Sequence, residues 1–129
     1  MESVRVAPLV GIVGCLAVLA ALLAPYLLVA GGVGTYYGSG VVNPLAAGLL
    51  ALVTIIVLAA GREGRADPGL AAGAGLVFGL FIFLIALGWG MTARVDVVAL
   101  PEWHRWVTAG VAVVTPLSAV WYTRALGLL

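Results

Sequence analysis

Long uncharged apolar stretches alternate with short charged clusters along the chain. The charged residues gather at the front, at residues 62–67, at residues 94–105 and at Arg124. A glycine-rich segment divides the first long stretch, and each resulting stretch is close to the roughly 20 helical residues that cross a bilayer. The pattern predicts an all-α polytopic membrane protein, a bundle of four transmembrane helices at about residues 6–30, 44–60, 68–93 and 101–125.

Prolines mark the starts of three of these predicted helices. Asn43 precedes Pro44, and Asp67 precedes Pro68. Asn and Asp are good N-cap residues, and proline is favoured at the first helical position. Pro101 opens the fourth predicted helix in the same way.

The fourth stretch has two further features of a spanning helix. Pro116 lies in its middle and is expected to kink it, and the Thr115 hydroxyl could bond the carbonyl that the proline leaves free. Aromatic residues favour the membrane interfaces, and they flank both ends of this stretch. They are Trp103, Trp106, Trp121 and Tyr122.

Residues 31–40 are predicted to form a loop. They include five glycines and two tyrosines, and they carry no charge. Glycines permit turns that other residues resist. The rings of Tyr36 and Tyr37 are expected in the headgroup zone, where both ring and hydroxyl are satisfied.

Composition supports a membrane location and a single domain, residues 1–129. Of the residues, 64% are hydrophobic and 9% are charged, which is too little polar surface to cover a soluble domain. The net charge of +1 does not suggest nucleic-acid binding by a basic face. Cys15 is the single cysteine, so it cannot form an internal disulfide, and we expect it to be buried.

Arginine counts predict the orientation in the membrane. With four spans, the N-terminus, the middle turn and the C-terminus share one side. That side carries Arg5, Arg62, Arg65 and Arg124, whereas the other carries Arg94 and Arg105. Because positive residues favour the inner side, we expect a protein of the cell membrane with both termini in the cytoplasm.

The third stretch contains a candidate helix-packing site. Gly75 and Gly79 form a GxxxG motif, and small residues on one stripe let two helix backbones approach closely. The stripe consists of Ala71, Gly75, Gly79, Ala86 and Gly90. Its partner is either another helix of the same chain, which we favour, or a second copy. The first stretch, with Gly11 and Gly14, is a plausible internal partner.

A second candidate site lies at the start of the fourth stretch. Its residues are Arg94, Asp96, Glu102, Trp103, His104, Arg105 and Trp106. One interpretation is an interfacial lipid, ion or partner site, or an acid/base pair of Glu102 with His104. The interpretation that we favour is an ordinary helix start, in which Glu102 pairs with Arg105 and the tryptophans anchor the depth.

The residue types that are missing exclude several functions. Apart from their ends, the predicted spans contain no Asp, Glu, Lys, Arg or His, which argues against a proton-coupled transporter or pump. No nucleophile–base set or phosphate loop is present, so we expect no enzymatic activity. One histidine cannot ligate a haem twice, and no other metal-ligand set is visible, so no cofactor or metal is predicted.

Several short segments carry a family resemblance. The chain also contains no Lys and no Gln, which is typical of a GC-rich genome. The segments are Gly34-Thr35-Tyr36-Tyr37, Asn43-Pro44-Leu45, Gly61-Arg62-Glu63-Gly64-Arg65, Leu76-Val77-Phe78-Gly79-Leu80-Phe81, His104-Arg105-Trp106 and Pro116-Leu117-Ser118-Ala119-Val120-Trp121-Tyr122. Over nearly its whole length the chain resembles a group of small four-span membrane proteins from halophilic archaea. This resemblance implies a location and a topology but no activity.

Two functions follow from these observations. The leading hypothesis is a structural or accessory subunit that packs in a homo-oligomer or a larger membrane complex, with lipids, itself or other membrane subunits as partners and no nucleic acid. The alternative is a small oligomeric channel or facilitator for ions or small solutes. Its pore would be lined by the hydroxyls of Thr54, Thr92, Thr108, Thr115 and Ser118.

Overall fold

The protein is helical through most of the chain that the computed structural model describes, residues 2–28, 31, 33–92 and 103–128. Four apolar spans form its body, and no strand occurs among these residues. The spans are α1 (Glu2–Leu28), α3 (Leu45–Arg62), α4 (Pro68–Thr92) and a fourth span built from α5 (Trp103–Ala112) and α6 (Val114–Ala125). The predicted fold class is confirmed, and the spans fit a multi-pass membrane protein.

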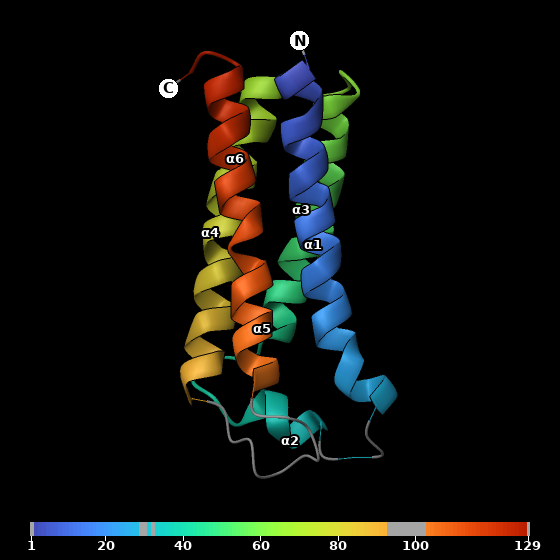
Figure 1. The fold of residues 1–129 in the computed structure, drawn as a ribbon, viewed down its shortest axis with the longest axis vertical. Helices are drawn as coiled ribbons and strands as arrows, with labels where there is room; N and C mark the ends of the chain where they lie inside the picture. The colour runs from blue at the N-terminus through green and yellow to red at the C-terminus, as the bar shows by residue number, and fades with distance from the viewer. Residues whose placement is uncertain (1, 29–30, 32, 93–102, 129) are drawn as a thin grey trace.

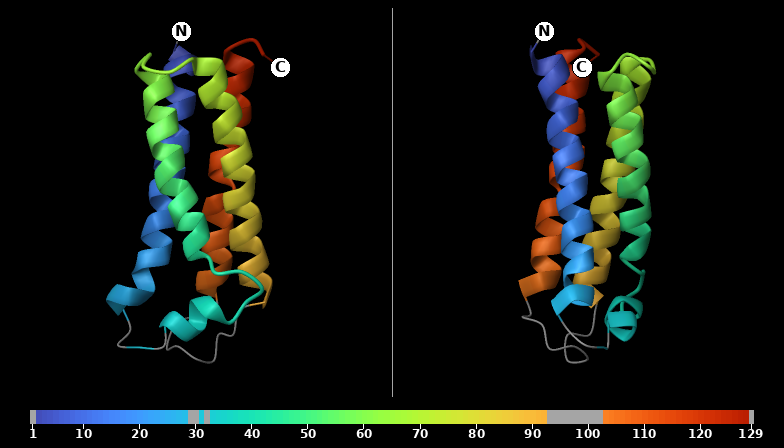
Figure 2. Two further views of the ribbon diagram at one scale, coloured as in Figure 1. Left: turned by 180° about the vertical axis from the view of Figure 1, so that it is seen from behind. Right: turned by 90° about the vertical axis from the view of Figure 1, so that its right-hand side faces the viewer.

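The four spans run antiparallel around a ring, in the order in which they occur along the chain (Figure 1, Figure 2). α1 packs against α3 and α6, and α4 packs against α3 and both parts of the fourth span. Both termini and the α3–α4 turn, residues 63–67, lie at one end, here called the termini end. The short helix α2 (Val33–Gly38) lies at the opposite end, the α2 end.

Asp67 caps α4 as predicted, whereas the N-cap residue of α3 is Pro44, and Asn43 accepts a hydrogen bond just before that helix. The Leu45 amide donates to Asn43 Oδ1 at 2.9 Å, and the Leu70 amide donates to Asp67 Oδ2 at 3.0 Å. Each bond satisfies an amide that has no partner within the first turn of a helix. These bonds let each span begin abruptly after a proline-marked turn.

The fourth span breaks near Pro116, as predicted, but one turn earlier than the proline itself. α5 ends at Ala112, and the Val113 amide bonds the Gly110 carbonyl at 3.3 Å. Pro116 has no amide to offer the carbonyl four residues before it, so the regular pattern fails at Ala112. The expected bond from Thr115 to the freed carbonyl does not form. The Thr115 hydroxyl lies 3.4 Å from Cys15 Sγ on α1 instead.

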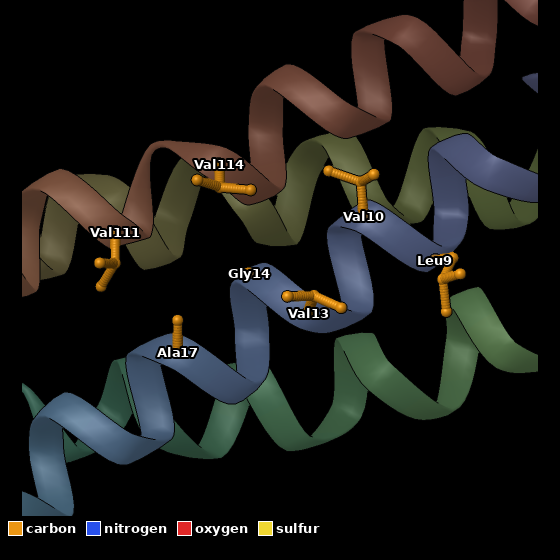
Figure 3. A pocket seen from close by; sticks show the side chains of 7 residues that line it. All are labelled: Leu9, Val10, Val13, Gly14, Ala17, Val111 and Val114. Atoms are coloured by element: carbon orange, nitrogen blue, oxygen red, sulfur yellow. The ribbon is translucent and has the colours of Figure 1, made fainter.

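A shallow apolar groove lies beside this break, between α1 and the fourth span (Figure 3). Its volume is about 280 Å³. Gly14 and Ala17 form its low part, and valines stand along both sides. The lining residues are Leu9, Val10, Val13, Gly14, Ala17, Val111 and Val114. We refer to it below as the α1 groove.

The glycine-rich segment departs from the predicted loop. Residues 33–38 form α2, and the side chains of Tyr36 and Tyr37 are buried rather than exposed to the headgroup zone. An uncharged segment gains more by packing its rings onto the open end of the bundle than by leaving them at the surface. α2 therefore packs over the end of the bundle that lies opposite the termini.

The aromatic belt is present in part. Trp103, Trp106 and Trp121 are exposed, as predicted for interfacial anchors. Tyr122 is fully buried against Leu58 and Ala72, so its assignment to the belt is wrong. The ring of Tyr122 fills space between the spans that the small residues of α4 leave open.

The small-residue stripe of α4 lies inside the bundle, and all five of its residues are buried. A Cβ on Gly79 would lie 2.8 Å from the Pro116 nitrogen, and one on Gly90 would lie 3.3 Å from the Arg105 carbonyl oxygen. Gly75 faces Leu58 of α3. The stripe therefore packs against α3 and the fourth span of the same chain.

The first span is not the partner of this stripe, contrary to the expectation from its glycines. Gly11 faces Ser118 and Leu58, and Gly14 faces Val114. The glycines of α1 thus also pack against α3 and α6. In a ring of four helices α1 and α4 are diagonal, and the fourth span lies between them.

Gly79→Ala should destabilise the bundle, because the added methyl meets the backbone of Pro116, which cannot rotate away. We expect a loss of about 1–3 kcal/mol in the free energy of unfolding. The matched control is Gly73→Ala on the same helix, where nothing lies within 4 Å of the new methyl. Denaturation in mixed micelles measures both variants. Equal stability of the two would contradict the close contact of α4 with α6.

Candidate interfacial site at the α2 end

Aromatic side chains from three helices meet under α2. The rings of Tyr36 and Tyr37 stack with their centroids 5.4 Å apart, and each meets Trp89 of α4 edge to face, at 5.0 and 5.3 Å. His104 of α5 lies 5.7 Å from the Tyr36 ring. Stacked and edge-to-face rings at such distances attract one another. We call Tyr36, Tyr37, Trp89 and His104 the aromatic cluster.

Both ring nitrogens of His104 have partners within the protein. Nε2 lies 2.7 Å from the Ala21 carbonyl oxygen of α1, and Nδ1 lies 2.8 Å from the Tyr36 hydroxyl oxygen. A carbonyl can only accept, so Nε2 carries the proton. In the neutral ring Nδ1 then accepts from the Tyr36 hydroxyl. One side chain thereby joins α1, α2 and α5.

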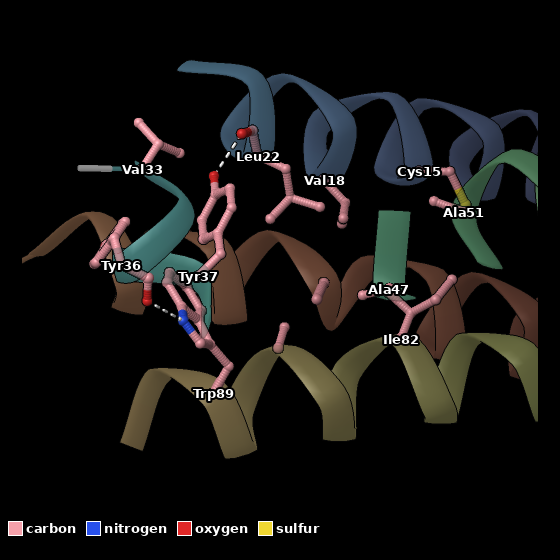
Figure 4. Packing of buried hydrophobic residues seen from close by; sticks show 12 residues of the cluster. Cys15, Val18, Leu22, Val33, Tyr36, Tyr37, Ala47, Ala51, Ile82 and Trp89 are labelled. Carbon is pink, nitrogen blue, oxygen red and sulfur yellow. Dashed lines mark hydrogen bonds between the residues drawn. The ribbon is translucent and has the colours of Figure 1, made fainter. Parts of the chain in front are cut away.

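Two further hydrogen bonds fix α2 to its neighbours (Figure 4). Trp89 Nε1 donates to the Tyr36 carbonyl oxygen at 3.2 Å, and the Tyr37 hydroxyl donates to the Leu22 carbonyl oxygen. Each bond contributes about 0.5–1.5 kcal/mol, and more is lost if a buried partner is left unpaired. The cluster is thus both tightly packed and hydrogen-bonded.

The two tyrosine hydroxyls stay protonated at ordinary pH. Burial raises the pKa of Tyr36 to about 12, although the positive charge of Arg105 opposes the shift. Burial, with the neighbouring Tyr36 and Tyr26, raises the pKa of Tyr37 further. Both groups can therefore act as donors throughout the physiological range.

The residues of the site predicted at the start of the fourth span point in different directions. His104 points inward and is 6% exposed, whereas Trp103 and Trp106 are 61% and 45% exposed. Arg105 donates from Nη1 to the Gly90 carbonyl oxygen at 2.9 Å, and its guanidinium carbon lies 4.9 Å from the Trp106 ring centre. A cation near the last turn of α4 also matches the negative end of that helix dipole.

Arg94, Asp96 and Glu102 lie outside the described residues, as do the predicted pairs of Glu102 with Arg105 and with His104. Because both nitrogens of His104 are bonded to the protein, its position is that of a structural residue. Sequence reasoning missed Tyr36, Tyr37 and Trp89 as its neighbours. The signal that could have found the tyrosines is their position in a segment with no charge to hold it in water.

Three of the buried hydroxyls bond within their own helices. Thr54 donates to the Leu50 carbonyl, Thr108 to that of His104, and Ser118 to that of Thr115, at 2.7–2.9 Å. Such bonds satisfy a hydroxyl without any partner across the bundle. These hydroxyls therefore form no polar row facing a shared space.

The comparisons with known proteins give one match. A protein-family model described as a family of unknown function (DUF7548) matches residues 1–127. The search of curated proteins and the search of solved structures found no match. Within the described part of the chain, no group of three His, Cys, Asp or Glu residues is placed to hold a metal.

Tyr36→Phe tests the hydrogen bond at the centre of the cluster. The phenyl ring keeps the stacking, but His104 Nδ1 loses its donor in a buried place, so we expect unfolding to become easier by about 1–3 kcal/mol. Tyr26→Phe is the control, because Tyr26 is 48% exposed and touches the cluster only through its ring. Thermal unfolding in lipid nanodiscs compares them. A Tyr36→Phe protein as stable as the control would refute the structural role of this bond.

Proposed function

We propose that the chain, which belongs to the family of unknown function DUF7548, is a small non-enzymatic accessory subunit that packs through its lipid-facing surface. The four apolar helices make it a multi-pass membrane protein. Beyond that, the observation that carries the proposal is the closed interior of the bundle. Its core is apolar, and the buried hydroxyls of Thr54, Thr108 and Ser118 donate to carbonyls of their own helices. Among the described residues, the buried Tyr122 hydroxyl has no hydrogen-bond partner.

A closed interior leaves the outer surface as the place for function. The stripe glycines Gly75, Gly79 and Gly90 already pack against α3 and the fourth span, so they are not available to a further helix. The α1 groove is different, because Ala17 in its low part is only half-buried and the wall residues Leu9 and Val13 are exposed. Val13 is 57% exposed and stands beside the half-buried Ala17.

The occupant that we propose for the α1 groove is a second copy of this chain. The same face of α1 carries protruding side chains, Val13 and Leu16, next to a low position at Ala17. A two-fold axis along this face would place the protrusions of one copy against the low part of the other, as in an isologous dimer. Helices that approach at small residues associate in lipid through van der Waals contact.

Ala17→Leu should weaken this dimer, because the larger side chain fills the α1 groove. Overpacking of about 1–3 kcal/mol corresponds to a dimer constant weakened about fivefold to a hundredfold. Native mass spectrometry of the protein released from nanodiscs, over a range of protein-to-lipid ratios, measures the dimer fraction.

Ala46→Leu provides the matched control. It makes the same change at an exposed alanine of α3, away from the α1 groove. The control should leave the dimer fraction unchanged. A protein that stays monomeric at every ratio, or two variants that behave alike, would refute association through α1.

We propose further that the termini end faces the cytoplasm. Arg5, Arg62, Arg65 and Arg124 lie at this end, and the positive-inside rule supports the assignment. A reporter enzyme that is active only in the cytoplasm, fused after residue 129, should be active, and the same reporter in the 31–40 segment should not. The reverse result would show that the termini end faces outward.

We also propose that the protein comes from a halophilic archaeon. This proposal rests on the absence of lysine among its basic residues and on the family resemblance.

A further inference from the structure

A second groove follows α3 and α4 toward the termini end. Its low positions are alanines, among them Ala60, Ala66 and Ala74, and its apolar walls include Ile56 and Phe78. Its volume is about 490 Å³. We call it the α3–α4 groove.

The α3–α4 groove continues into a polar mouth. A neighbouring hollow of about 380 Å³ shares Ile56 and Ala60 with it and is also lined by Glu63 and Arg65. The apolar channel therefore leads directly to charged side chains at the α3–α4 turn. Two other grooves, the α1 groove and one lined by residues from Leu19 to Leu52, have apolar residues and glycine only.

The length of the groove suits one lipid tail. Along α3 it runs from Val53 to Ala60, which is about 10 Å at 1.5 Å per residue. One leaflet contributes about 15 Å of hydrocarbon, half of a core of about 30 Å. The groove thus stays within a single leaflet and opens at its surface, as a lipid tail with its headgroup requires.

The charge at the mouth favours an anion. Glu63 is neutralised by Arg62, whose Nη1 lies 3.3 Å from the Glu63 Oε1, and Arg62 also donates to the Arg5 carbonyl oxygen. Asp67 accepts from the Leu70 amide at the start of α4. Arg65 is exposed, and among the described residues no ion pair involves it. The guanidinium of arginine binds phosphate oxygens through two parallel hydrogen bonds.

We propose that the α3–α4 groove binds one anionic phospholipid of the leaflet at the termini end, with an alkyl chain on the alanines and the phosphate on Arg65. The site lies on the opposite side of the ring from the α1 groove and does not depend on dimer formation. The net negative charge of the headgroup supplies the selectivity over a zwitterionic lipid.

Native mass spectrometry with added phosphatidylglycerol or phosphatidylcholine tests this site. We expect the protein to retain a single phosphatidylglycerol about tenfold more tightly than phosphatidylcholine, because the two share the phosphate but only phosphatidylcholine carries a cationic trimethylammonium group, which Arg65 repels. Arg65→Gln should abolish the preference. Arg124→Gln removes an equally exposed charge at the same end, outside the groove, and should preserve it.

Ala74→Leu tests the contact with the lipid tail separately from the contact with the headgroup. It fills the low part of the groove, so binding of both lipids should fall about tenfold, whereas Ala46→Leu on the outer face of α3 should leave it intact. Equal retention of the two lipids by the unmodified protein, or equal effects of Arg65→Gln and Arg124→Gln, would overturn the proposal. Displacement of the lipid by inorganic phosphate would also overturn it, since the site would then be for a free anion. Because Ala17 lies outside the α3–α4 groove, loss of the dimer would leave this result unaffected.

Discussion

The rest of the bundle depends on the contact between the α4 backbone at Gly79 and the fourth span at Pro116. Only glycine leaves room there, since a Cβ would lie 2.8 Å from the proline nitrogen. Pro116 in turn breaks the hydrogen-bond pattern at Ala112, which separates α5 from α6. The fourth span can therefore lie against α1 through α6 while α5 carries His104 beneath α2. The break thus lets one span make two contacts, that of α6 with α1 and that of His104 with Tyr36.

The α2 end shows what a membrane protein must do with a segment that carries no charge. The backbone and side-chain polar groups of α2 cannot be left unpaired near lipid. Tyr36, Tyr37, Trp89 and His104 solve this by bonding to one another and to carbonyls of α1 and α2. The same requirement accounts for Thr54, Thr108 and Ser118, whose hydroxyls donate to carbonyls of their own helices.

The sequence predicted what depends on long runs of residues and missed what depends on a few. The four spans and the cap at Asp67 were predicted, because length, hydropathy and local chemistry determine them. The six residues of α2 are too few for a periodic pattern, so that helix was missed. The inward orientation of His104 could not be inferred from its exposed neighbours, Trp103 and Trp106. Small residues indicate that a helix packs closely against another helix, but they do not identify that helix. For this reason α1 was proposed as the partner of the α4 stripe, whereas the structure shows α3 and the fourth span there.

The ring order gives the outer surface two separate faces. The α1 groove lies on the side formed by α1 and the fourth span, and the α3–α4 groove lies on the opposite side. A dimer formed through α1 would therefore leave both α3–α4 grooves facing lipid, one on each outer side of the pair. Because the arginines lie at the termini end in both copies, the two bound headgroups would share one leaflet. Dimer and lipid are thus compatible, and an anionic lipid at each outer flank would keep the pair at a fixed depth in the membrane.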